Sequence, residues 1–64
     1  MIVQFVDSVT GTAVYINPEF VLTLRPDPVD PVNVTMVKLS DGETFRVRGE
    51  HQAVADKLAR SKAA

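Results

Sequence analysis

Residues 32–48 read VNVTMVKLSDGETFRVR, and this stretch decides the fold. It consists of two runs rich in β-branched residues on either side of Ser40-Asp41-Gly42-Glu43. β-Branched side chains favour pleated strands, and Asp-Gly between two such runs is typical of a two-residue hairpin turn. The stretch therefore predicts an antiparallel pair formed by strands 32–39 and 43–48.

Alternation along strand 43–48 predicts which of its side chains face the core. Phe45 and Val47 point inward. Three polar side chains then point outward together: Thr44, Arg46 and Arg48. In strand 32–39 the apolar residues occur at both parities, so either both faces are covered or a bulge near Met36–Val37 exchanges them.

Residues 20–25 alternate more regularly and predict another strand. One face carries Phe20, Leu22 and Leu24, and the other carries Val21, Thr23 and Arg25. The following residues, 26–31, contain three of the four prolines, so we expect this segment not to pair in a sheet. We expect a stiff, exposed loop there, in which Asp27 and Asp30 form turns and are solvated.

The N-terminal part predicts a second hairpin. Ile2–Val6 and Ala13–Ile16 are short apolar runs, and the turn between them contains Gly11, which is free to adopt a positive φ. Pro18 ends the second strand because it lacks a ladder donor, and Asn17 is placed to cap a short helical turn.

The spacing becomes helical from Glu50. A narrow apolar stripe follows at i, i+3, i+4 and i+7: His51, Val54, Ala55 and Leu58. Such a short helix is marginal alone, so we expect it to cover a sheet, while residues 61–64 fray.

Together these elements predict a single small domain over residues 1–64. The fold class is mainly β (α+β), with five short antiparallel strands in a curled meander and one C-terminal helix. The sheet is expected to be small, open and barrel-like. A composition of 45% hydrophobic and 23% charged residues is that of an ordered globular protein.

Composition also limits the function classes. The chain has no cysteine, one histidine and a net charge of −1, which gives no strong field for nucleic acid or membrane. No apolar run approaches the length of a membrane span, and the N-terminus lacks the pattern of a signal peptide. Because a small secreted domain usually needs disulfides, the lack of cysteine favours a cytoplasmic protein. We expect no catalytic residue, cofactor or metal site, because His51 has no evident nucleophile and acid beside it.

The candidate partner-binding residues are the cations and the threonine on the outer side of the sheet: Arg25, Lys38, Thr44, Arg46 and Arg48. Arg46 and Arg48 share a face by alternation, whereas the side occupied by Lys38 depends on the suspected bulge. Such a stripe suits an acidic partner or a phosphate backbone. The competing interpretation is a solvated face that keeps a strand edge from aggregating.

Parts of the chain resemble the small bacterial flagellar proteins of the FlbD type, which are related to the swarming-motility protein SwrD. The matching stretches are Ile16-Asn17-Pro18-Glu19-Phe20-Val21, Val34–Leu39, Ser40-Asp41-Gly42-Glu43 and Phe45-Arg46-Val47. The resemblance covers roughly residues 11–58. It implies short strands, a hairpin through a glycine turn, a closing helix and a motility-related role. The pattern is also similar to the longer, more basic DNA-binding domain of LytTR-type response regulators.

These observations predict a non-catalytic bacterial interaction module that acts through a strand edge or the outer sheet face. Its partner is expected to be a protein or a second copy of the chain, since one helix cannot cover all the apolar strand surface. The alternative is a nucleic-acid-binding module that uses the Arg46 and Arg48 face.

Overall fold

The computed structural model describes residues 2–63, and of residues 61–63 it describes the backbone only. The elements in chain order are β1 (Val3–Val6), β2 (Ala13–Ile16), the short 3-10 helix η1 (Pro18–Phe20), β3 (Val21–Pro26), β4 (Val34–Leu39), β5 (Thr44–Arg48) and α1 (His51–Ala63). All strand pairs are antiparallel, so the predicted class, mainly β with one C-terminal helix, is confirmed.

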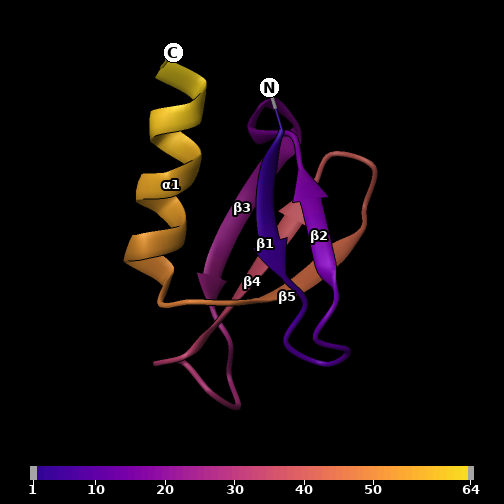
Figure 1. Ribbon diagram of the computed structural model, residues 1–64, viewed down its shortest axis with the longest axis vertical. Helices are drawn as coiled ribbons and strands as arrows, with labels where there is room; N and C mark the ends of the chain where they lie inside the picture. The colour runs from indigo at the N-terminus through magenta and orange to yellow at the C-terminus, as the bar shows by residue number, and fades with distance from the viewer. Residues whose placement is uncertain (1, 64) are drawn as a thin grey trace.

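The strands form two sheets. β1 pairs with β2, while β3, β4 and β5 form a three-stranded meander (Figure 1). Within residues 2–63, a single bridge between Asp7 and Val47 joins the sheets, and the Ser8 backbone N–H donates to the Arg46 carbonyl at 2.8 Å beside it. The structure is therefore open at this seam rather than a closed barrel.

Helix α1 runs beside the sheets and covers their inner side (Figure 1). The buried core combines residues from β1, β2, β4, β5 and α1: Val3, Phe5, Ile16, Val37, Val47, Val54 and Leu58. Glu50 caps the N-terminus of the helix. Its carbonyl accepts from the Val54 N–H at 3.0 Å, and its carboxylate accepts from the Gln52 N–H at 3.2 Å. Fraying was expected from residue 61, whereas the described backbone continues α1 to Ala63; residue 64 lies outside the described residues.

The hairpin between β4 and β5 has a three-residue loop, so the expectation of a two-residue turn is wrong. The Gly42 N–H donates to the Leu39 carbonyl at 3.0 Å, and the Leu39 N–H donates to the Glu43 carbonyl at 2.8 Å. Gly42 has a φ of 92°, as the last residue of such a loop requires. The signal for a hairpin was correct, but Asp-Gly alone does not fix the loop length.

A bulge lies in β3, between Val21 and Thr23, and not in β4 as suspected. It places Leu22 outside the regular ladder and reverses the faces of the residues before it. Val21 and Leu24 therefore pack against the core, whereas Phe20 is 55% exposed and Leu22 is 61% exposed. The predicted common face for Phe20, Leu22 and Leu24 is wrong for this reason.

Strand β4 has apolar residues at both parities because both of its faces are covered near its start. Val34 is 7% exposed and Thr35, on the opposite face, is fully buried. The Thr35 hydroxyl donates to the Gly49 carbonyl at 2.9 Å, which satisfies its polar atom and ties β4 to the end of β5. This outcome is the first of the two alternatives for this strand.

The N-terminal turns follow the sequence closely. Gly11 adopts a φ of 76° in the loop between β1 and β2. The Asn17 side chain accepts from the Glu19 N–H at 3.0 Å and caps η1, which Pro18 opens. Both local predictions are confirmed.

Candidate functional site

The candidate site is the outer face, defined as the side of the three-stranded sheet that points away from α1. Residues that lie opposite one another on antiparallel strands point to the same side. Two cross-strand rows therefore make up the middle of this face: Thr23–Lys38–Thr44 and Arg25–Met36–Arg46. The intervening row, Leu24–Val37–Phe45, points to the core, as its burial shows.

A hollow of about 230 Å³ lies on this face and is here called the outer hollow. Its lining consists of two cations, two threonines and two apolar residues: Arg25, Lys38, Thr23, Thr44, Met36 and Pro28. Arg25 and Lys38 are exposed, and Met36, which lies opposite Arg25, is half-buried. Three of the five predicted site residues, Arg25, Lys38 and Thr44, are thus brought together.

Charge at the outer hollow is of one sign. Its lining includes no carboxylate. Among residues 2–60, whose side chains the structure describes, the ion pairs join Asp27 to Arg46 and Glu50 to His51. The guanidinium of Arg25 and the ammonium of Lys38 are therefore available to an anionic ligand.

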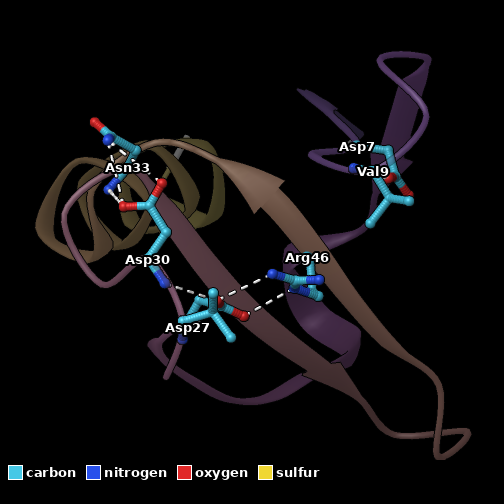
Figure 2. Close-up of polar contacts among 7 residues, drawn as sticks. Asp7, Val9, Asp27, Asp30, Asn33 and Arg46 are labelled. Atoms are coloured by element: carbon cyan, nitrogen blue, oxygen red, sulfur yellow. Dashed lines mark hydrogen bonds and ion pairs between the residues drawn. The ribbon is translucent and has the colours of Figure 1, made fainter.

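Arg46 belongs to the same face but is bound to Asp27 (Figure 2). Its Nε donates to Asp27 Oδ1 at 2.8 Å and its Nη2 donates to Asp27 Oδ2 at 3.1 Å, so both carboxylate oxygens are engaged. This bidentate geometry is the strong form of an arginine–carboxylate contact. Arg46 is half-buried, and its expected role as a free outer cation is corrected.

Asp27 also organises the loop that follows β3. Its Oδ2 accepts from the backbone N–H groups of Val29 and Asp30, both at 3.0 Å. The side chain is 2% exposed. The predicted turn-forming role is confirmed, but Asp27 is not solvated, and Pro26 pairs with Thr35 within the sheet. The rest of the loop is exposed or half-buried, as expected.

These contacts determine the protonation of the pair. The Arg46 guanidinium and the backbone N–H groups of Asp30 and Val29 lower the pKa of the Asp27 carboxyl, against a smaller opposing effect of burial. The hydrogen bonds to the Asp27 carboxylate and its negative charge raise the pKa of Arg46. Both groups are therefore charged at neutral pH, and the loop stays fastened to β5 with Pro28 at the wall of the outer hollow.

Arg48 lies apart from the outer hollow. It lines a second hollow of about 530 Å³ with Asp30 and Glu50, at the junction of the loop after β3 and the start of α1. Both carboxylate residues line this hollow with Arg48, although neither forms an ion pair with it among the described side chains. Arg48 is exposed, as predicted, but the structure does not place it with Arg25 and Lys38.

His51 has the features of a boundary residue. It is half-buried, its Nδ1 is inaccessible without a hydrogen-bond partner, and the nearest carboxylate oxygen, Glu50 Oε1, is 3.9 Å away. Within the described part of the chain, no group of three or more His, Cys, Asp or Glu residues could hold a metal ion.

Sequence reasoning missed Met36 and Pro28 as parts of the site and Asp27 as its organiser. The position of Met36 followed from its pairing with Arg25, but the suspected bulge obscured it. For Asp27 the available signal was its place directly after a predicted strand, in Arg25-Pro26-Asp27, within a loop whose prolines restrict the backbone. Nothing in that signal named Arg46 as the partner.

Comparisons with protein-family models, with curated proteins and with solved structures found no match. None of the helices in the described residues has the length and apolar character needed to cross a membrane.

Proposed function

We propose that this protein is a non-catalytic interaction module that binds an acidic segment of a protein partner in the outer hollow. The observation that carries the proposal is the meeting of Arg25 and Lys38, two exposed cations on neighbouring strands, in a hollow whose lining has no carboxylate. Arginine and lysine pair with carboxylates, and the apolar surface of Met36 and Pro28 adds contact area for aliphatic side-chain stems.

The outer face is favoured over the free edge of β3 as the contact surface. The Asp27 N–H donates to the Val34 carbonyl at 3.0 Å, so Asp27 directs its backbone groups toward β4. Successive residues of a strand direct their N–H and C=O groups to alternate sides, so those of Leu24 and Pro26 point to the free edge. Pro26 has no N–H, and Leu22 lies in the bulge. A strand added at this edge would find one regular donor, at Leu24, so addition of a partner strand is unfavourable.

The test is a titration of the ¹⁵N-labelled chain with an oligo-glutamate peptide at low ionic strength. Amide shifts are expected to change at the residues that line the outer hollow, and the affinity should fall as salt screens the charges. The double variant Arg25→Gln/Lys38→Gln should lose most of this binding. Arg60→Gln is the matched control, because Arg60 is an exposed cation on α1. Equal losses in both variants would contradict the proposal.

Nucleic-acid binding is the alternative function, and the same titration with an oligonucleotide in place of oligo-glutamate tests it. Arg46 is committed to Asp27 and Arg48 lies beside two carboxylates, so the face offers little continuous positive charge to a phosphate backbone. No aromatic residue lines the outer hollow for base stacking. An oligonucleotide that binds more tightly than oligo-glutamate would reverse the order of the two functions.

Self-association is a second alternative, and light scattering over a range of concentrations tests it. Phe20, Leu22 and Tyr15 are exposed apolar or aromatic side chains that could support it. A dimer abolished by Arg25→Gln/Lys38→Gln would assign the outer hollow to a second copy instead of a different protein.

The resemblance to FlbD-type proteins supports placing this module in the bacterial cytoplasm with a motility-related role. Deletion of its gene should then reduce spreading in soft agar, and expression of the wild-type chain should restore it. Restoration by the Arg25→Gln/Lys38→Gln variant would separate the motility role from the outer hollow.

A further inference from the structure

We propose that the outer hollow recognises an extended segment with two acidic residues separated by one residue, Asp/Glu-x-Asp/Glu. This inference rests on the proposed function and deepens it by naming the pattern that the hollow selects. It follows from the relative positions of Arg25 and Lys38 on their strands.

Arg25 and Lys38 are diagonal neighbours. Arg25 lies opposite Met36, and Lys38 lies opposite Thr23, so the two cations are offset by two residues across β3 and β4. The Cα atoms of diagonal neighbours of this kind lie about 7–8 Å apart. Residues i and i+2 of an extended peptide point to the same side and are about 6.6 Å apart. The two spacings match closely enough for each carboxylate to meet one cation.

The two cations offer different surroundings to a carboxylate. Lys38 lies between Thr23 and Thr44 in one cross-strand row, so each neighbouring strand contributes a hydroxyl-bearing side chain beside it. Arg25 lies opposite Met36, and Pro28 lines the same hollow, so a carboxylate held in bidentate fashion by the planar guanidinium would have apolar surface nearby. One acidic residue therefore fits each end of the outer hollow.

Other spacings engage one cation only. Adjacent acidic residues of an extended peptide point to opposite sides, and so do residues i and i+3. Residues i and i+4 share a side but are about 13 Å apart, beyond the separation of a diagonal pair. The matched spacing adds a second exposed ion pair, for which we expect a gain in affinity of about two- to fivefold.

The experiment uses short capped peptides of identical composition, each with two glutamates separated by zero, one, two or three intervening residues. Amide shift titrations of the full ¹⁵N-labelled chain give the dissociation constants. The peptide with one intervening residue should bind about two- to fivefold more tightly than the others. Either Arg25→Gln or Lys38→Gln should remove this preference, while Arg60→Gln should retain it.

The outcomes separate the inference from the proposed function. Equal affinities for all spacings, with binding still lost in Arg25→Gln/Lys38→Gln, would overturn the spacing rule and leave the acidic-segment function intact. Failure of every peptide to bind would overturn both. A preference for spacing that persists in Arg25→Gln would place the second contact elsewhere and also defeat the inference.

Discussion

At the scale of single residues, Asp27 shows how one buried carboxylate shapes the site. It receives four hydrogen bonds, two from Arg46 and two from backbone N–H groups. Removing one partner of such a pair leaves the charge of the other without an opposite charge beside it. The Asp27–Arg46 pair therefore holds both the loop after β3 and the wall of the outer hollow. Asp7 acts similarly in the other hairpin, where it accepts from the backbone N–H of Val9 (Figure 2) and from that of Thr10.

The first prediction concerns the acid stability of this pair. The pKa of Asp27 is lower in the folded chain than its ordinary value of 3.8, so the unfolded chain binds more protons in the acidic range. Its stabilising contribution is therefore complete above about pH 5 and is lost as the pH falls below 3.8 through the folded-state pKa. Asp27→Asn should lower the free energy of unfolding at pH 7 and flatten its decline in acid, as measured by urea titrations across that range.

The slope should flatten without vanishing in Asp27→Asn. The N–H groups of Thr10 and Val9 lower the pKa of Asp7, which contributes acid sensitivity of the same sign. Asp56→Asn, at an exposed position on α1, provides the control for the loss of one carboxylate from the surface. An Asp27→Asn profile parallel to that of the wild type would argue against a charged Asp27 in the folded chain.

At the scale of elements, the β4–β5 hairpin gives the second prediction. Gly42 closes the loop with a φ of 92°, where a side chain is strained, although an added Cβ would meet no atom within 4 Å. Gly42→Ala should therefore cost about 1–2 kcal/mol of unfolding free energy through backbone strain alone. Asn tolerates positive φ better, so Gly42→Asn should cost less. Equal costs in urea denaturation would show that strain at this position is not the cause.

Local signals along the chain predicted most of these elements. Alternation placed Phe45 and Val47 inward, Pro18 and Asn17 marked η1, and the switch to helical spacing marked α1. These features depend on neighbours within a few residues. The bulge at Leu22 could not be predicted in this way, because it depends on the register that β3 adopts against β4.

The candidate site was predictable only in part for the same reason. Alternation on one strand grouped Arg46 with Arg48, but the sheet joins Arg25, Lys38 and Thr44 from three strands. The Asp27–Arg46 contact spans nineteen positions in sequence and depends on how the loop folds back over β5. Contacts between segments distant in sequence decide which charged residues form ion pairs and which are available to a partner. No local sequence pattern encodes those contacts.

At the scale of the whole molecule, Val47 is the point where the two sheets and the helix meet. It is fully buried, bridges to Asp7 and belongs to the same core cluster as residues of β1, β2 and α1. Val47→Ala should cost about 2 kcal/mol, from lost burial and the cavity that remains. Val29→Ala, at a site 84% exposed, should change the unfolding free energy by less than about 0.5 kcal/mol. A similar cost for both variants in urea titrations would contradict the position of Val47 in the core.

The last prediction is that the two sheets unfold together, although a single bridge joins their backbones. A two-stranded hairpin is marginal on its own, and β1 and β2 bury Val3, Phe5 and Ile16 only against the shared core. Lys57 adds a direct tie, because its ammonium donates to the Gln4 carbonyl at 2.7 Å and lies over the Phe5 ring. Tyr15, the single tyrosine, reports on β2 in a chain without tryptophan, whereas far-ultraviolet circular dichroism reports on all elements. Their urea transitions should coincide within error. An earlier tyrosine transition would mean that the hairpin detaches first, and that the outer face does not require it.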